Sequence, residues 1–197
     1  NDELLVLWNK VRNLEDDALR TINFIKAAKQ GKEAFSKVKG NQPLAAINSV
    51  LGEQAASKAG HLIGRKDVGS PEDIRAANAV THKFIGAMNA MEGTNMRLNS
   101  VVKSIQSSKP EFGQEQAFNT SEFGGYEQMG KDDLEVTLEQ MRYEGAPEER
   151  IEAIRKIYQR EIEGNGARIP SEPSYLGSLK SVANDPRYLA EKKRRGL

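Results

Sequence analysis

The chain has 197 residues, and its 29 lysines and arginines nearly balance its 28 aspartates and glutamates, so charge alone favours no class of partner. The absence of cysteine excludes disulfides, thiolate nucleophiles and the usual cysteine-rich zinc and iron–sulfur sites. Hydrophobic residues make up 38% of the chain and aromatic residues 6%, which allows only a modest core. No apolar run approaches the roughly 20 residues that span a bilayer, so we expect no membrane span.

The first predicted element is an amphipathic helix over residues 2–30, with Gly31 as its stop. Its apolar residues recur at helical spacing, at Leu4, Leu7, Val11, Leu14, Ala18, Ile22 and Ile25. The chain begins at Asn1 rather than at methionine and is apolar-periodic almost at once. We therefore expect a trimmed or processed product, or one piece of a longer polypeptide.

Residues 31–42 are compatible with a short helix or with an open linker. A second helix is predicted from Pro43, whose fixed φ suits the first helical position, to Gly60. Because this segment is rich in alanine and only weakly apolar, it needs a neighbouring element to be stable.

The strongest helix signal begins at Ser70, an N-cap residue followed by Pro71 at the first helical position. From there an apolar seam repeats every seven residues. Its ten positions are Ile74, Ala77, Thr81, Phe84, Met88, Met91, Asn95, Leu98, Val102 and Ile105. At about 1.5 Å rise per residue, this pattern predicts a helix of roughly 50 Å in a bundle or coiled coil.

The residues that flank the seam are mostly apolar, with only Glu92 charged. A wide apolar face favours a multi-helix bundle, within one chain or between subunits, over an isolated two-stranded zipper. Asn95 is interpreted either as a tolerated residue near the surface or as a register-setting contact. The residues expected to bind a partner along this seam are Ile74, Phe84, Met88, Met91, Asn95, Leu98, Val102 and Ile105.

Periodicity ends after Ile105, and residues 107–130 are predicted to form an irregular arm with widely spaced aromatic residues. Such an arm packs either on its own bundle or on another subunit. Residues 131–164 are predicted to form an αα-hairpin, because Gly145 and Pro147 separate two segments with apolar residues at helical spacing.

Charge is distributed unevenly along the chain. Residues 20–66 contain nine bases and two acids, whereas residues 131–163 contain six bases and ten acids. This asymmetry could set head-to-tail contacts between copies, or it could be solvated surface without a partner.

A proline-bearing linker and a short helix are predicted before a basic end of the chain. The basic residues there are Arg187, Lys192, Lys193, Arg194 and Arg195. They could contact nucleic-acid phosphates or an acidic protein face, or form a solvated tail.

Catalytic motifs are absent from the sequence. There is no HExxH, no phosphate-binding Gly-x-x-x-x-Gly-Lys-Ser/Thr loop and no Gly-x-Ser-x-Gly. The two histidines are His61 and His82, and His82 is expected to be a partly buried, hydrogen-bonded imidazole beside the seam. We therefore expect no enzymatic activity, no cofactor and no metal.

The run from Ala183 to Leu189, which reads Ala-Asn-Asp-Pro-Arg-Tyr-Leu and leads into the basic residues, resembles the C-terminal ends of some bacteriophage head-assembly and internal virion proteins. The resemblance covers about fifteen of the 197 residues and assigns no residue roles. It implies a virion or scaffolding role.

Together these patterns predict an all-α protein, an elongated helical bundle with one long central helix and a peripheral αα-hairpin. We expect a helical bundle domain over residues 1–106, the irregular arm over 107–130, the hairpin over 131–164, and the linker, short helix and basic tail over 165–197.

The expected function is that of a non-enzymatic structural or assembly protein that acts through contacts with other subunits, as a homo-oligomer or in a larger assembly. A virion or scaffolding component, in the virion or the host cytoplasm, is its specific form. Two alternatives stay open: a nucleic-acid-binding helical module that uses the basic segments, and a secreted helical effector or translocation component.

Overall fold

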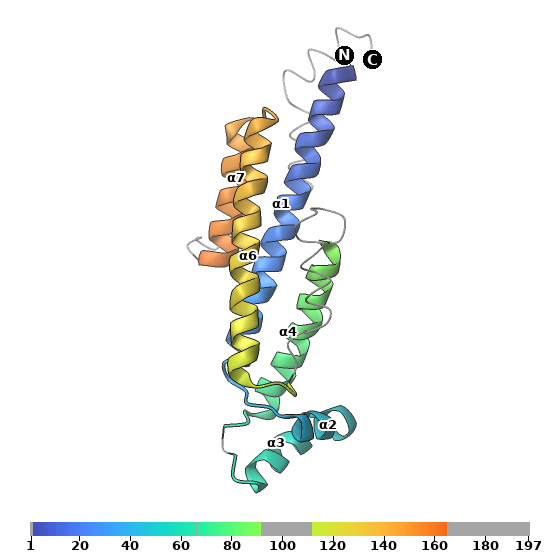
Figure 1. Cartoon of the computed structure of the whole chain (residues 1–197), viewed down its shortest axis with the longest axis vertical. Coiled ribbons are helices and arrows are strands. Elements are labelled where there is room, and N and C mark those ends of the chain that lie inside the picture. The colour runs from blue at the N-terminus through green and yellow to red at the C-terminus, as the bar shows by residue number, and fades with distance from the viewer. Residues whose placement is uncertain (1, 66, 92–111, 165–197) are drawn as a thin grey trace. The chain divides into compact units, whose positions relative to one another are not determined.

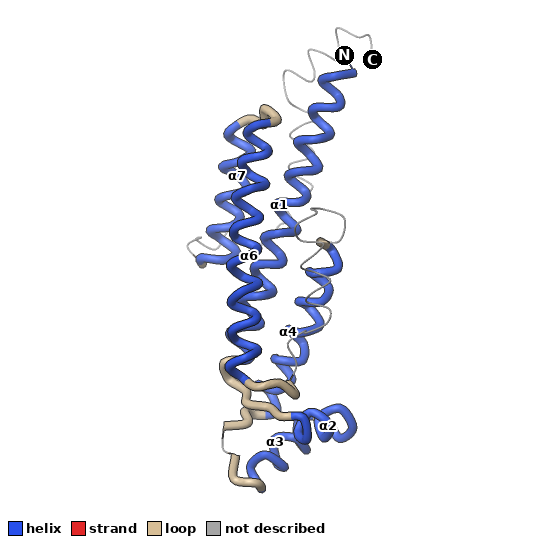
Figure 2. The backbone as a smooth tube through the Cα atoms, in the orientation of Figure 1, coloured by secondary structure: helices blue, strands red, loops and turns tan. Residues whose placement is uncertain are grey.

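The computed structural model describes residues 2–65, 67–91 and 112–164, and within these ranges the chain contains helices, turns and loops but no strand (Figure 2). The chain divides into two units, residues 1–165 and 166–197, and the described residues all belong to the first. Its helices are α1 (Asp2–Phe35), α2 (Gln42–Leu51), α3 (Glu53–Leu62), α4 (Pro71–Ala90), α6 (Gln116–Tyr143), α7 (Glu148–Tyr158) and the π-helical turn η1 (Gln159–Glu163). The prediction of an all-α bundle is confirmed.

Helix α1 is the long helix around which the first unit is built, and both α6 and α4 pack along it (Figure 1). Its buried positions follow the predicted helical spacing at Val11, Ala18, Ile22 and Ile25. The predicted stop at Gly31 is wrong, because the helix continues to Phe35. Gly31 lies inside the helix, and Phe123 of α6 occupies the space where a Cβ would stand.

The single helix predicted from Pro43 to Gly60 is two helices. Gly52 separates them with a φ of 83°, a left-handed conformation that side chains with a Cβ rarely adopt. Asn41 caps α2, since its side-chain oxygen accepts a hydrogen bond from the backbone N–H of Leu44 at 2.9 Å. The chain can therefore turn between α2 and α3 within one residue.

Helix α4 begins as the sequence predicts. The Ser70 hydroxyl oxygen accepts a hydrogen bond from the Asp73 backbone N–H, and the Asp73 carboxylate accepts one from the Ser70 backbone N–H, each at 3.1 Å. The seam is buried at Ile74, Ala77 and Phe84. The helix is described to Ala90, and its predicted continuation to Ile105 lies outside the described residues.

The prediction of an irregular arm over residues 107–130 is wrong from Gln116 onward, because these residues form the first half of α6. Buried positions of α6 do recur at helical spacing, but many of them hold polar residues or glycine. They are Asn119, Phe123, Tyr126, Gly130, Asp133, Leu134, Thr137, Leu138 and Met141. The apolar periodicity of this helix is therefore weak in the sequence. The adjacent residues Gly124 and Gly125 are also typical of a loop.

The predicted antiparallel helix pair is present as α6 and α7. Gly145, with a φ of 79°, lies in the short connection between them. Ile151 and Ile154 of α7 are buried. Because α6 is one continuous helix from Gln116, the predicted boundary at residue 130 does not separate two structural segments.

Two clusters of buried side chains hold the first unit together, and α1 contributes to both. One cluster is aromatic: Phe84 of α4 lies 5.3 Å from Phe24, 5.1 Å from Phe123 and 5.2 Å from Tyr126 between ring centroids. The other is aliphatic and joins α1 to the hairpin through residues such as Ile22, Leu138 and Ile151. Most of the large apolar residues of α4 are thus used inside the chain.

Candidate functional site

The residues predicted to form a partner-binding seam are divided by the structure. Ile74, Phe84, Met88 and Met91 are all buried in the aromatic cluster of their own chain. They are therefore not available as an intersubunit surface in this fold, and the prediction that they bind a partner is wrong. Their apolar face packs on α1, and Phe84 also contacts Phe123 and Tyr126 of α6.

The remaining predicted site residues lie outside the described residues. These are the seam positions Asn95, Leu98, Val102 and Ile105, and the basic residues Arg187, Lys192, Lys193, Arg194 and Arg195.

An exposed apolar surface that the sequence reasoning missed lies at the amino end of α1. It consists of five consecutive side chains, Leu4, Leu5, Val6, Leu7 and Trp8, which are between 36% and 63% exposed. We call this set the amino-end patch. Residues 4–10 are all exposed, and Val11 is the first buried residue of the helix. The signal in the sequence is the run itself, since five successive residues of an α-helix cannot all face one neighbour.

The turn between α6 and α7 lies beside this end of α1. The Arg150 guanidinium carbon lies 4.5 Å from the centre of the Trp8 ring, a cation–π geometry, and Arg150 also pairs with Glu15 at 3.1 Å. Burial raises the pKa of Glu15 above its usual range, and the nearby Arg150 charge offsets this only in part. Arg150 therefore holds one face of Trp8 in place while the ring stays partly exposed.

Paired acidic and basic side chains border the amino-end patch. The Glu144 carboxylate lies 3.5 Å from the Lys10 ammonium, which fixes the turn against α1. Glu148 accepts a hydrogen bond from Arg142 at 2.8 Å, and this bond holds the pKa of Glu148 below its usual range. Glu149 is exposed and forms no ion pair among the described residues.

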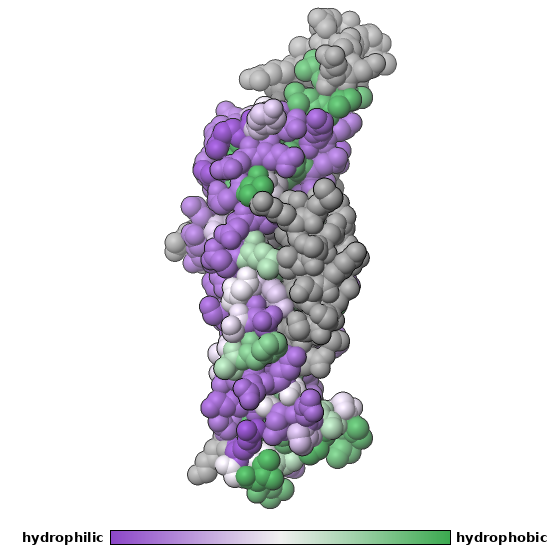
Figure 3. Space-filling view, viewed as in Figure 1, coloured by the Kyte–Doolittle hydropathy of each residue, from purple (hydrophilic) through white to green (hydrophobic). Residues whose placement is uncertain are grey.

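Two further pairs of exposed apolar side chains lie at opposite ends of the ten-residue helix α3. Val50 and Leu51 lie just before its start, Leu62 and Ile63 lie at its end, and the four side chains are between 64% and 87% exposed. Figure 3 shows hydrophobic side chains near both ends of the visible face. The exposed bases Lys58 and Arg65 are close to Leu62 and Ile63 in the sequence, and neither forms an ion pair among the described residues.

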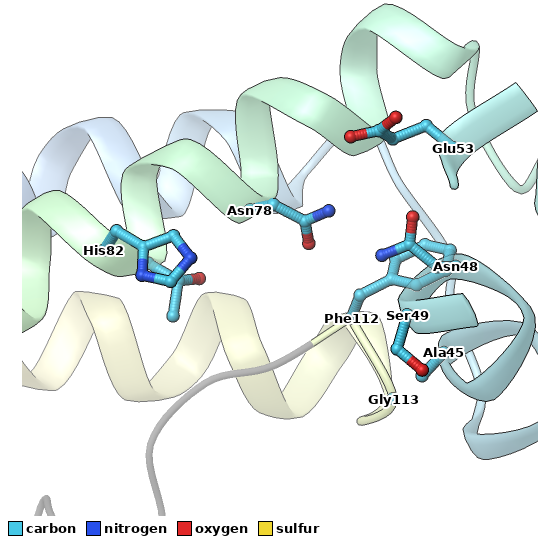
Figure 4. Close-up of a pocket in the computed structure, with 9 residues that line it drawn as sticks. Ala45, Asn48, Ser49, Glu53, Asn78, His82, Phe112 and Gly113 are labelled. Atoms are coloured by element: carbon cyan, nitrogen blue, oxygen red, sulfur yellow. The ribbon is translucent and has the colours of Figure 1, made fainter. Parts of the chain in front are cut away.

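A pocket of about 440 Å³, lined by both polar and apolar residues, lies between α2, the start of α3, α4 and residues 112–113 (Figure 4). Figure 4 shows the side chains of Asn48 and Asn78 pointing toward one another across it. Oδ1 of Asn48 is buried and has no hydrogen-bond partner in the described part of the chain. The lining can hydrogen-bond water or a small polar molecule. Glu53 pairs instead with Arg75, at 4.0 Å, so the pocket does not place this acid beside His82 as an acid–base pair.

The structure places both histidines at the surface. His61 and His82 are both exposed, so the prediction of a partly buried imidazole at His82 is wrong. The position next to the seam faces outward because the seam itself turns inward onto α1 and α6. Across residues 2–65, 67–91 and 112–164 no group of three or more histidines, cysteines or carboxylates could hold a metal ion, and no helix there is long and apolar enough to span a membrane.

Basic residues along the second half of α1 are largely engaged with acceptors of their own chain. Lys26 pairs with Glu161 at 2.5 Å, and Lys32 lies 4.0 Å from Glu127. Lys29 donates a hydrogen bond to the carbonyl oxygen of Ile162. Part of the charge asymmetry seen in the sequence is therefore neutralised within the bundle.

Comparison of the chain with protein-family models, with curated proteins and with solved structures finds no match.

Proposed function

We propose that this chain is a non-enzymatic helical assembly protein that acts through protein–protein contacts. The single observation that carries the proposal is the amino-end patch, in which five consecutive large apolar side chains are exposed around a helix end. Contiguous exposed apolar patches of this kind are typical of interaction surfaces on soluble domains.

The local physics of α1 supports a partner at this patch. Residues 4–10 form about two helical turns whose side chains are all exposed, with Arg150 over one face of Trp8 and Glu144 beside Lys10, and isolated helical turns gain little stability in water. At about 25 cal/mol per Å², burying roughly 400 Å² of apolar surface would contribute around 10 kcal/mol. Association costs about 4–15 kcal/mol, so a contact of this size offsets costs in the lower half of that range.

The specific form that we propose is a virion or scaffolding component. The resemblance of residues 183–189 to the C-terminal ends of phage head-assembly and internal virion proteins supports this form. A helical chain with exposed apolar surface is consistent with a subunit that binds neighbouring subunits.

The nucleic-acid-binding alternative has weaker support. Three of the bases on α1 that would contact phosphates, Lys26, Lys29 and Lys32, are already bound to acceptors of the same chain. Phosphate contacts there would have to displace these interactions.

Association of the full chain tests the proposal. Sedimentation velocity at increasing concentration should show reversible growth in mass, and Val6→Lys should raise the apparent dissociation constant at least tenfold. The matched control is Val136→Lys, because Val136 is an exposed valine on α6 outside the amino-end patch, at 40% exposed against 55% for Val6. A wild-type chain that stays monomeric at every concentration, or an equal effect of the two substitutions, would overturn the proposal.

A further inference from the structure

The pocket between α2, the start of α3 and α4 contains a buried hydrogen-bond acceptor that the described chain leaves unsatisfied. Oδ1 of Asn48 lines this pocket, is buried, and has no hydrogen-bond partner among the described residues. A buried carbonyl oxygen without a donor lacks the hydrogen bonds that water gives it in the unfolded chain, so it destabilises the fold. A bound ion, water or ligand is the usual explanation of such a group in a native protein.

The two hydroxyl groups of the lining also face the pocket as acceptors. The Ser49 hydroxyl donates its proton to the carbonyl oxygen of Ala46 at 2.9 Å. The Thr81 hydroxyl donates its proton to the carbonyl oxygen of Ala77 at 3.1 Å. Because a hydroxyl group has only one proton, both oxygens offer a ligand lone pairs alone.

Glu53 places a negative charge near the Asn48 oxygen. In Figure 4 the amide oxygen of Asn48 points toward the side of the pocket where the Glu53 carboxylate lies, and His82 lies at the other end of the pocket. The ion pair of Glu53 with Arg75 is long, at 4.0 Å, and the Arg75 side chain is 63% exposed. Since an exposed ion pair of this kind contributes little, a cation in the pocket can compete for Glu53.

Carbon surface completes the lining, through the side chains of Ala45 and Phe112. The volume of about 440 Å³ lies within the range of small-molecule sites, which is about 300–1,000 Å³. A ligand that matches this lining has several N–H donors, a positive charge and a short apolar chain.

We propose that this pocket binds a primary ammonium group carried on a short apolar chain. An ammonium has three N–H donors and no acceptor, which matches the Asn48 oxygen, the Glu53 carboxylate and one hydroxyl oxygen. The apolar chain would lie against Ala45 and Phe112. A free alkylamine and a lysine side chain of another protein share this chemistry. The pocket is separate from the amino-end patch, and the inference does not depend on the proposed function.

An NMR titration of the ¹⁵N-labelled full chain with butylammonium chloride at constant ionic strength tests the site. Amide signals of α2 and the start of α3 should shift together, with a dissociation constant on the order of 1 mM. At neutral pH the amine is charged, because an alkylammonium such as that of lysine has a pKa of about 10.4. 1-Butanol has a similar chain without the charge and should bind at least tenfold more weakly.

Two results of the titration would overturn the proposal. One is the absence of a saturable shift with butylammonium. The other is saturable binding of sodium butyrate at the same amides, which would show that Asn48 presents its NH₂ group to the pocket instead of its oxygen.

A neutral lysine derivative, Nα-acetyl-lysine methylamide, distinguishes the two sources of the ammonium group. Tighter binding of this derivative than of butylammonium would identify a lysine side chain of another protein as the ligand. Weaker binding would identify a free alkylamine, because the backbone amides would then not fit beside the pocket.

Asn48→Leu separates binding from folding. Leucine is similar in size but lacks the oxygen, so the dissociation constant for butylammonium should rise at least tenfold. The urea midpoint of the ligand-free chain should stay the same or rise, because an unsatisfied buried oxygen is removed. The control is Asn89→Leu, at an exposed position of α4 outside the pocket, which should leave binding unchanged. Equal binding by Asn48→Leu and wild type would overturn the proposal.

Arg75→Gln should change binding in the opposite direction. It removes the competing partner of Glu53, so the dissociation constant for butylammonium should fall at least twofold. The control is Lys58→Gln on α3, which removes the same charge from an exposed residue that does not line the pocket. An equal effect of the two substitutions would show that Glu53 does not bind the ammonium group, and would overturn the proposal.

Discussion

Two glycines allow α1 and α6 to lie close together, and neither can be replaced without cost. A Cβ on Gly130 of α6 would lie 2.6 Å from Cγ1 of Ile25, and a Cβ on Gly31 of α1 would overlap the Phe123 ring. Glycine inside a helix ordinarily costs about 1 kcal/mol relative to alanine. Here that cost is offset by the close contact between the two helices.

Gly130→Ala should therefore destabilise the protein although alanine is the better helix former. We expect a loss of about 1–3 kcal/mol from the free energy of unfolding, because the added methyl group overpacks the contact with Ile25. The control is Gly125→Ala on the same helix, where a Cβ would meet nothing within 4 Å. The control should gain up to about 1 kcal/mol. Urea unfolding measures the free energy of unfolding of both variants. A Gly130→Ala variant that is more stable than wild type would contradict the close contact between α1 and α6 at Gly130.

A second single-residue prediction concerns the contribution of the aromatic cluster to stability. Phe84→Ala should cost about 3–5 kcal/mol, because Phe84 is buried against Phe24, Phe123 and Tyr126. Phe118→Ala, at an exposed position of α6, should change the free energy of unfolding by less than about 1 kcal/mol. Thermal and urea unfolding compare the two variants, and similar losses would argue against Phe84 as the centre of the core.

At the scale of elements, the start of α4 makes stability depend on pH. Hydrogen bonds from the Ser70 hydroxyl and the Ser70 backbone N–H hold the pKa of Asp73 below its usual value of 3.8. A carboxyl whose folded-state pKa is lowered stabilises the fold above its unfolded pKa, and this stabilisation is lost as pH falls through the folded value.

Asp73→Asn should accordingly be less stable than wild type at neutral pH. The difference should shrink as pH falls below about 4, where the wild-type carboxylate gains a proton. The control is Glu72→Gln, which removes a neighbouring first-turn carboxylate that forms no capping hydrogen bond in the described structure. Urea unfolding at several pH values measures the differences, and a difference independent of pH would contradict the role of the Asp73 charge.

Elements with strong local signals could be predicted from the sequence, and elements held together by tertiary contacts could not. Ser70 and Pro71 fix the start of α4 through backbone and capping chemistry that acts within one turn. The first half of α6 has no such signal, since Asn119 and Gly130 occupy buried positions that local reasoning treats as loop residues. Their burial depends on α1, which is distant in the sequence.

The candidate site, too, could be predicted only in part from the sequence. The sequence predicts the apolar face of α4, but it does not show whether that face packs against its own chain or against another chain. In the structure Phe84 and Met88 meet their own chain, and the apolar surface left exposed begins at Leu4. The buried face of α1 begins at Val11, and the residues before it stay exposed although Arg150 lies over one face of Trp8.

At the scale of the whole molecule, the only tryptophan of the chain is part of the proposed contact and can report on it. Trp8 is 42% exposed in the single copy, so association should bury its ring and shift its emission to shorter wavelength as concentration rises.

The Val6→Lys variant provides the control for this measurement, because it keeps Trp8 but disrupts the amino-end patch. Its emission should not change with concentration over the range in which wild type associates. A shift shared by the variant would place the burial of Trp8 in some contact other than the amino-end patch.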